Sequence, residues 1–308
     1  MSMIRVLRTL SFSLSCVIFL TLLFSCSRQD EAGYQPEFTV KHNDQFKEYV
    51  VGIHPLHNPK RLMEIYGAFI EHANLQIPDV RFRLEASRNY EDFDKKLYAG
   101  YYDLAMPNPY QTVRALKYGY RVFAKMGDDA EFCGIILVRK DSNIHEVTDL
   151  KGKVVSYPAK TALAATMLPQ YFLHTNGIDI NFDIENRYVG SQESSILNVL
   201  RGHAAAGATW PLPWKRFSAE HPEMANQLEV KWQTAPLLNN SWVARRDVPR
   251  TVVDQFKTQL LDLDKTPAGR KMLAKLPISK FETASDETYL PVIKFLEIFS
   301  SDVREIEW

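Results

Sequence analysis

Residues 48–70, EYVVGIHPLHNPKRLMEIYGAFI, are the stretch that indicates the fold of this chain. The run 48–53 reads as a β-strand, and the loop 54–58 follows it. Asn58 can cap a helix whose first position is Pro59, where a missing N–H does no harm. Apolar side chains then recur at helical spacing, at Leu62, Ile65, Tyr66, Phe69 and Ile70. The stretch therefore predicts a strand, a loop and a helix in that order.

The same alternation continues along the chain. We expect further strands at 80–84, 103–106, 120–125, 134–139, 154–156, 186–189, 204–208, 228–233 and 241–244, and helices at 90–98, 110–116, 161–174, 191–201, 249–263, 268–276 and 286–299. Such a pattern predicts an α/β fold with mostly parallel sheets. Ligands in such folds bind outside the carboxyl ends of the strands. We therefore look for a site in the strand-to-helix loops, at 54–58, 107–110, 157–162, 190–194 and 209–213.

The N-terminus predicts export from the cytoplasm. Arg5 and Arg8 precede an apolar run over 10–24, which is typical of a secretory signal peptide and short for a membrane-spanning helix. The sequence Leu-Phe-Ser-Cys that ends at Cys26 resembles the lipobox of bacterial lipoproteins, which implies cleavage after residue 25 and lipidation of Cys26. Ordinary secretion and an uncleaved anchor are the alternatives. The polar residues 26–47 are expected to be a tether.

Composition narrows the function classes. The chain is 45% hydrophobic and 24% charged, as in a packed globular protein. Without residues 1–25 it keeps 35 basic and 37 acidic residues, which gives a net charge of −2 and no basic excess for nucleic acid. Cys133 is then the remaining cysteine besides Cys26, so no intramolecular disulfide is expected, and a buried apolar role suits it better than catalysis.

No enzyme signature is present in the sequence, since the glycine-rich, nucleophile-elbow and zinc-protease motifs are all missing. His54 and His57 lie three residues apart, but a metal site needs three or four converging ligands. We therefore expect no metal and no cofactor. One of the two histidines could form hydrogen bonds in a pocket, or both could be ordinary loop residues.

Polar and aromatic residues in the expected loops are the candidates for ligand binding. A helix start near Ser191 offers free N–H groups, although simple capping would also explain its serines. Tyr110 could contact a ligand or begin the core face of its helix, and the stiff loop around Trp210 could clamp a ligand or pack. The candidate ligand-binding residues are His54, His57, Asn58, Asn108, Tyr110, Tyr157, Lys160, Thr161, Gln192, Glu193, Ser194 and Trp210.

Several short motifs in this order resemble the phosphate/phosphite/phosphonate-binding family of periplasmic solute-binding proteins, which serve ABC importers. The resemblance covers roughly residues 48–299. It rests on Gly52-Ile53, Pro55 and Asn58-Pro59; on Gly100, Asp103-Leu104-Ala105 and Pro109; on Asp141-Ser142-Asn143-Ile144 and Asp149-Leu150-Lys151-Gly152-Lys153; and on Pro169, Gly190 and Leu197-Asn198-Val199-Leu200-Arg201-Gly202.

The resemblance implies a two-lobed type 2 periplasmic-binding fold with a ligand cleft between the lobes. Residues 1–25 would be the signal peptide and 26–47 the tether. Lobe 1 would take 48–132, lobe 2 would take 133–237, and 238–308 would return to lobe 1. The two crossing segments would fall near 132–136 and 235–242.

The chain departs from the family pattern at the expected anion site. The family commonly carries D-P-x-S-T-S-G, where hydroxyl groups at a helix start hold the oxyanion, and this chain has Ala162-Leu163-Ala164-Ala165 instead of Ser-Thr-Ser-Gly. Phosphonate binders tend to have a histidine in place of Gln192. Since each lost hydrogen bond to a charged oxygen is worth about 1.5–3 kcal/mol, a less charged solute than phosphonate is expected. Lys160 could supply one positive charge and so keep an anion as the alternative.

The expected function is a lipid-anchored periplasmic protein that delivers a small solute to an ABC permease. A receptor that presents its ligand to a membrane histidine kinase would use the same cleft and is the alternative. An enzyme on this fold is the least favoured reading, because paired catalytic groups are lacking. The sequence leaves open whether the inner or the outer membrane holds the anchor.

Overall fold

The computed structural model describes residues 46–276 and 278–307. Residues 46–308 form one compact unit. The expected signal peptide, Cys26 and almost all of the expected tether lie outside the described residues. In the described part of the chain, no helix combines the length and the apolar character that a membrane crossing requires.

The first of two β-sheets has six strands, in the order β11-β4-β10-β3-β1-β2. β1 pairs in parallel with β2 and β3, whereas β10 runs antiparallel to β3 and β4 and β11 runs antiparallel to β4. The strands are β1 (Lys47–Ile53), β2 (Val80–Ala86), β3 (Leu104–Met106), β4 (Tyr120–Met126), β10 (Ser241–Arg245) and β11 (Phe281–Thr283).

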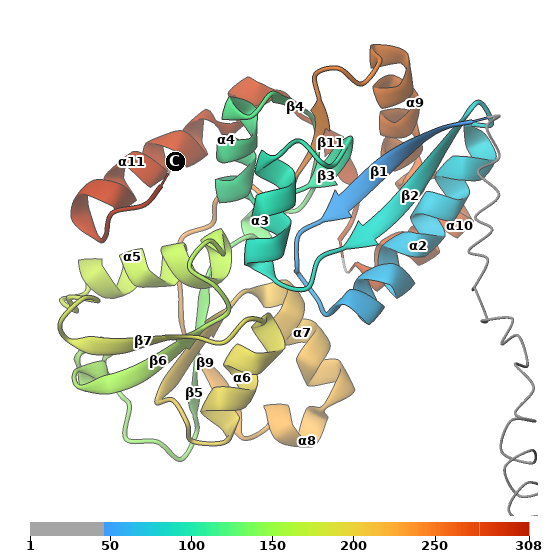
Figure 1. Ribbon diagram of the computed structural model, residues 1–308. Helices are drawn as coiled ribbons and strands as arrows, with labels where there is room; N and C mark the ends of the chain where they lie inside the picture. Colours follow the sequence, from blue (N-terminus) through green and yellow to red (C-terminus); the bar gives the residue numbers. More distant parts are fainter. Residues whose placement is uncertain (1–45, 277, 308) are drawn as a thin grey trace, which may run out of the picture. The chain divides into compact units, whose positions relative to one another are not determined.

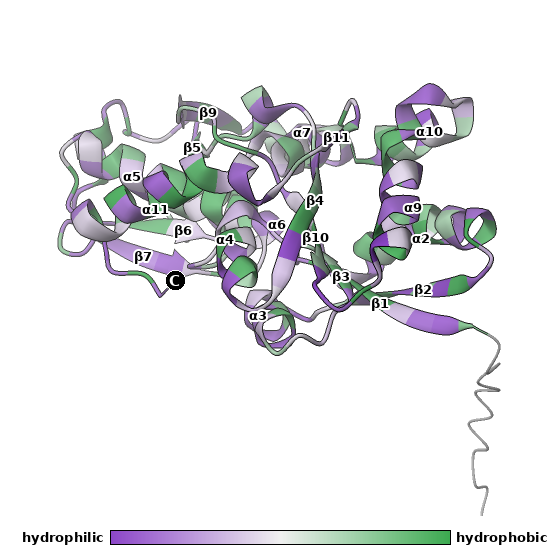
Figure 2. Cartoon of the chain, turned by 90° about the horizontal axis from the view of Figure 1, so that it is seen from above, coloured by the Kyte–Doolittle hydropathy of each residue, from purple (hydrophilic) through white to green (hydrophobic). Residues whose placement is uncertain are grey.

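The second β-sheet has five strands, in the order β7-β6-β8-β5-β9. β6 is parallel to β7 and β8, and β5 is antiparallel to β8 and β9. These strands are β5 (Ile135–Arg139), β6 (Lys153–Tyr157), β7 (Ile184–Tyr188), β8 (Ala206–Thr209) and β9 (Leu228–Gln233). The edge strand β7 is hydrophilic and its neighbour β6 more apolar, as Figure 2 shows.

Helices surround both sheets (Figure 1). The six-stranded sheet with its helices is called lobe 1 below, and the five-stranded sheet with its helices is called lobe 2. The helices of lobe 1 are α2 (Pro59–Gln76), α3 (Tyr90–Tyr98), α4 (Pro109–Lys117), α9 (Arg250–Leu261), α10 (Pro267–Lys275) and α11 (Leu290–Asp302). Those of lobe 2 are α5 (Leu168–Thr175), α6 (Gln192–Leu200), α7 (Pro211–Glu220) and α8 (Pro222–Ala225).

The chain passes from lobe 1 to lobe 2 between β4 and β5 and returns between β9 and β10. The predicted α/β fold with two lobes is confirmed. The expectation of mostly parallel sheets is wrong, because four strand pairs are parallel and five antiparallel among the described strands. Asn58 caps α2 as expected, because its side chain accepts a hydrogen bond from the backbone N–H of Arg61. Cys133 is fully buried, which agrees with the apolar role expected for it.

Three local predictions need correction. The segment 209–213, expected to be a loop, contains the first turn of α7, because Pro211 fits the first helical position after Trp210. The helix expected over 161–174 begins with a π-helical turn, Leu163–Met167, before α5. The short strand β11 and the four-residue helix α8 were not predicted, since elements this short show little periodicity.

The small residues of β8 let α6 approach the sheet of lobe 2 closely. A Cβ atom on Gly207 would lie 2.4 Å from Val199 Cγ2 and 2.8 Å from Ser195 O, both on α6. The Ser195 hydroxyl lies within hydrogen-bond distance of the backbone oxygens of Ser156 in β6 and Ala208 in β8 and can donate its one hydrogen to either, which fixes the same helix. This close packing sets the position of the start of α6, where Gln192 lies.

Candidate functional site

A cavity of about 10 Å³ lies where loops of both lobes meet, which is room for roughly one water molecule. It is called the central cavity below. Lobe 1 contributes His54, Tyr90 and Asn108, lobe 2 contributes 162–165, Gln192 and Trp210, and the crossing segments contribute Phe132 and Asn240. The loops after β1, β3, β6, β7 and β8 thus converge here, as the rule for open α/β sheets predicts.

His54 is held by its own lobe. Its Nδ1 lies 2.9 Å from the carbonyl oxygen of Met106, and its ring packs edge-on against Tyr90 and Phe93. Burial lowers the pKa of His54 to about 4, so the ring is neutral near pH 7. A carbonyl oxygen can only accept, so Nδ1 carries the hydrogen and Nε2 keeps a lone pair.

Asn108 connects the two lobes across the central cavity. Its Oδ1 accepts from the backbone N–H of Gln111 and caps α4, while its Nδ2 donates to the carbonyl oxygen of Thr161, 2.9 Å away in lobe 2. One amide side chain therefore orders a helix start in lobe 1 and binds the loop that leads into the π-helical turn.

The π-helical turn offers backbone donors without side-chain hydroxyls. Residues 162–165 are buried and apolar. The backbone N–H groups of Leu163, Ala164 and Ala165 donate to no acceptor among the described residues, as is usual in a first helical turn. A ligand oxygen in the central cavity could accept from these groups.

Gln192 and Tyr90 form a second polar link between the lobes. The Gln192 Oε1 accepts from the Thr209 hydroxyl at 2.9 Å, and its Nε2 lies 3.4 Å from the Tyr90 hydroxyl. Burial raises the pKa of Tyr90, so its phenol stays protonated and can donate. Trp210 is 3% exposed and packs edge-to-face on Phe132, with ring centroids 5.3 Å apart.

The central cavity carries no formal charge near pH 7. Its lining consists of alanines, a leucine, aromatic rings, amides and the neutral His54. Among the described residues, no group of three or more His, Cys, Asp and Glu side chains is placed to hold a metal ion.

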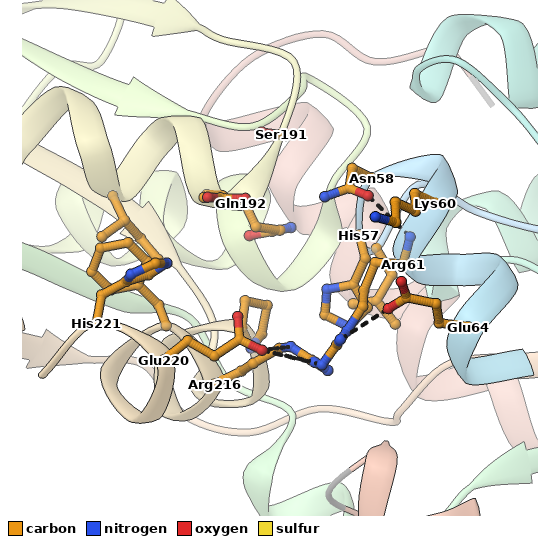
Figure 3. A pocket seen from close by; sticks show the side chains of 15 residues that line it. His57, Asn58, Lys60, Arg61, Glu64, Ser191, Gln192, Arg216, Glu220 and His221 are labelled. Atoms are coloured by element: carbon orange, nitrogen blue, oxygen red, sulfur yellow. Dashed lines mark hydrogen bonds and ion pairs between the residues drawn. The ribbon is translucent and has the colours of Figure 1, made fainter.

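A larger groove of about 290 Å³, called the rim groove below, lies between the start of α2 and the helices α6 and α7. Arg61 of lobe 1 forms an ion pair with Glu220 of lobe 2, with Nη2 and Oε1 3.1 Å apart. Figure 3 shows Arg216 and Glu64 extending this pair into a charged network. Burial and then the charge of Arg61 lower the pKa of His57, which lines this groove, to about 4.

A further groove of about 770 Å³, called the side groove below, runs along α3, α4, residues 158–161 and the C-terminal segment 304–307. Arg304 donates to Gln170 Oε1 and to the carbonyl oxygen of Lys160, so the C-terminal segment bridges to lobe 2. Burial raises the pKa of Asp94 in this groove to about 7, although Gln111 donates a hydrogen bond to it.

The candidate ligand-binding residues are divided among these places. His54, Asn108, Gln192 and Trp210 line the central cavity; His57, Asn58, Gln192 and Glu193 line the rim groove; Tyr110, Lys160 and Thr161 line the side groove. The remaining two candidates, Tyr157 and Ser194, line none of these three places. Tyr157 is fully buried beside Tyr188, and the Ser194 N–H donates to the capping hydroxyl of Ser191. Their roles in binding stay predictions.

Sequence reasoning missed Tyr90, Phe132 and Asn240. Tyr90 is the first residue of α3, directly after the loop that follows β2 and after the capping residue Asn89, so the same rule could have found it. Phe132 and Asn240 lie in the crossing segments, where no local pattern indicates that a side chain faces a cavity.

Two α/β lobes that face each other across a central cavity define a two-lobed periplasmic binding protein. The chain belongs to the family described as ABC transporter, phosphonate, periplasmic substrate-binding protein, which matches residues 51–289.

A probable ABC transporter phosphite-binding protein of Prochlorococcus marinus is 24% identical over 181 residues, which cover 54% of this chain and 61% of that protein. The phosphonates-binding periplasmic protein of Escherichia coli is 19% identical over 165 residues, which cover 52% of this chain and 49% of that protein. The chain therefore spans less than two thirds of the length of these relatives.

Solved structures agree with the fold. The Prochlorococcus marinus protein PhnD1 in complex with methylphosphonate superposes with a TM-score of 0.76 at 22% identity, covering 84% of this chain and 99% of that one. A binding protein component of an ABC phosphonate transporter from Pseudomonas aeruginosa gives 0.75 at 18% identity, covering 83% and 87%.

Proposed function

We propose that this chain is the extracytoplasmic solute-binding component of an ABC importer, and that it delivers a small solute to the permease. The observation that carries the proposal is the central cavity, whose lining comes from both lobes and from both crossing segments. A ligand that contacts all of these parts at once stabilises the arrangement in which the lobes are closed. The cavity also lacks a pair of charged acid and base groups, which favours binding over catalysis.

A small-angle scattering experiment tests this function. A solute that binds the central cavity should reduce the radius of gyration and raise the melting temperature with increasing concentration, because it binds only the folded protein. The panel should include oxyanions, amides and small zwitterions. A protein that stays unchanged in scattering and in melting across this panel would contradict the proposal.

We also propose that the ligand carries less charge than a phosphonate dianion. Such an ion loses hydration on entering the cavity and must recover it from fixed donors. The N–H groups of Leu163, Ala164 and Ala165 supply some donors, but the cavity lining includes no cation, and Lys160 lies over the Tyr188 ring in the side groove. Each missing charge-assisted hydrogen bond costs about 1.5–3 kcal/mol.

Calorimetry at neutral pH with phosphate, phosphite, methylphosphonate and 2-aminoethylphosphonate should therefore show weak binding or none. Ala164→Ser restores one hydroxyl at a serine place of the family pattern, with little added volume, and should strengthen whatever oxyanion binding is present. Ala205→Ser, at a partly buried alanine outside the central cavity, is the matched control. A sub-micromolar dissociation constant for any of the four anions with the wild-type protein would refute the proposal of a less charged ligand.

The proposed location is the periplasm, with an N-terminal lipid on Cys26 as the membrane anchor. The supporting observation is the lipobox-like sequence that ends at Cys26. Cys26→Ser should abolish labelling by a clickable fatty acid and release the protein from membranes. Unchanged labelling would show that the lipid, if present, is attached elsewhere.

A further inference from the structure

Buried hydrogen-bond acceptors without partners at the central cavity restrict the chemistry of the ligand. Asn240 is 1% exposed, and its Oδ1 has no hydrogen-bond partner among the described residues. Its Nδ2 faces the thioether sulfur of Met126 at 3.4 Å. Because a thioether can only accept, the amide is oriented with Nδ2 toward Met126, and Oδ1 is the atom left over.

His54, which is 3% exposed, supplies a second acceptor, although its Nε2 is not fully enclosed as Asn240 Oδ1 is. Its Nδ1 is committed to the carbonyl oxygen of Met106, so the free ring nitrogen is Nε2, which carries a lone pair in the neutral ring. No partner for Nε2 is found among the described residues. The edge-on packing of Tyr90 and Phe93 holds the ring in this orientation.

The central cavity also presents donors, which come from both lobes. The backbone N–H groups at 163–165 are free, and the Tyr90 hydroxyl already accepts from Gln192, so its own hydrogen can be donated. A buried acceptor that is left unpaired is destabilising, whereas a ligand hydrogen would satisfy it. The lining is thus complementary to a molecule that has both a hydrogen to donate and an oxygen to accept.

We propose that the central cavity selects a solute that bears at least one O–H or N–H donor, accepted by His54 Nε2 and Asn240 Oδ1, together with an oxo group that accepts from residues 163–165. This inference rests on the proposed solute-binding function and adds the ligand class to it. For an oxyacid, the form that fits is the protonated monoanion with one X–OH group. A fully ionised oxyanion would point its lone pairs at the lone pairs of both acceptors.

Two matched series of small probes test the proposal on the full-length protein. The first, in mildly acidic buffer, compares methylphosphonate with methyl methylphosphonate, which has the same single charge but no O–H. Ethylphosphonate controls for the added size and keeps the O–H. The second compares N-methylacetamide with N,N-dimethylacetamide, and N-ethylacetamide is its size control. Binding is followed by ligand-observed NMR up to millimolar concentration.

The donor-bearing members of each series should bind at least about tenfold more tightly than the donor-free member, because a polar site rejects an analogue that leaves its groups unpaired. His54→Phe keeps an aromatic ring but removes Nε2, and Asn240→Leu removes the amide oxygen. Each variant should reduce the ratio between the dissociation constants of the donor-free and the donor-bearing probes. His145→Phe, an exposed histidine of lobe 2, is the matched control and should leave the difference unchanged.

Equal dissociation constants of donor-bearing and donor-free probes for the wild-type protein would overturn the inference. An unchanged preference for donor-bearing probes in both His54→Phe and Asn240→Leu would overturn it as well. Neither result would contradict the solute-binding function. Failure of every probe and of the wider solute panel to bind or to close the lobes would overturn the proposed function itself. The wild-type comparison needs no variant, so a variant that fails to fold, as judged by circular dichroism, does not prevent the decision.

Discussion

The central cavity and the two grooves beside it all lie between the lobes, yet they are made from opposite chemistry. The cavity is lined by neutral, largely buried groups, whereas the rim groove holds the ion pair Arg61–Glu220 and the side groove holds Arg114 and Lys160. The desolvation free energy of a charged group is small at the partly exposed rim and large in the interior, because burial removes water from an ion. The comparison teaches that contact between the lobes is charged at the edge and neutral at the centre, where selection by hydrogen-bond pattern can operate.

The strongest test of this comparison removes packing from the central cavity. Trp210→Ala should lower the free energy of unfolding by about 3–5 kcal/mol, because Trp210 is buried against Phe132 and its removal leaves a void. Trp214→Ala is the matched control, since Trp214 is only partly buried and stacks on Phe217. Urea denaturation measures both. Equal losses for the two variants would mean that the cavity region is no better packed than the outer face of α7.

The pH dependence of the free energy of unfolding should have opposite signs for His54 in the central cavity and for Asp94 in the side groove. His54 has a pKa of about 4 in the folded protein and about 6.5 when unfolded, so the unfolded state gains the proton first as pH falls. Its contribution to stability is present above about pH 6.5 and is lost toward pH 4, by on the order of 3 kcal/mol. His57 acts in the same direction. His54→Phe should flatten this acid loss.

Asp94 should act with the opposite sign. Its pKa is about 7 in the folded protein and 3.8 in the reference state, so the folded state holds the proton over that window. Its contribution to stability is therefore greatest below about pH 4 and is lost as pH rises to about 7. Asp94→Asn should abolish this loss. Urea denaturation at a series of pH values measures both residues, and slopes of the same sign for Asp94→Asn and His54→Phe, relative to wild type, would refute the assignment.

The smallest effect is expected at the rim groove. Arg61 and Glu220 are 36% and 49% exposed, so Arg61→Gln should change the free energy of unfolding by only about 0–1 kcal/mol. It should nevertheless weaken closure of the lobes in a salt-dependent manner, since the pair spans them. Lys265→Gln, which breaks an ion pair within lobe 1, is the control. Distances between spin labels on the two lobes measure closure, and identical responses of both variants would show that the rim pair has no part in it.

Local sequence patterns predicted much of the fold because the elements follow from local chemistry. Period-two and helical spacing located most strands and helices, and Asn58 was identified as a cap from its position before a proline. The proline-rich stretch 211–213 was misread as a loop, although Pro at a first helical position is itself a start signal. The family resemblance, carried by short motifs in a fixed order, is confirmed by the match over 51–289.

The sequence by itself determined the α/β class and the loops that could carry a site, because strand-to-helix loops emerge at the carboxyl ends of strands. The two lobes were expected only from the family resemblance. Only the tertiary structure decided which side chains meet. Asn108 binds Thr161 and Arg61 binds Glu220 across 53 and 159 residues of sequence, and Asn240 reaches the central cavity from the second crossing segment. Such contacts depend on the order of strands in two sheets and on how closely β8 and α6 pack. Local sequence periodicity does not predict these long-range contacts, because they depend on how all strands and helices of the chain pack together.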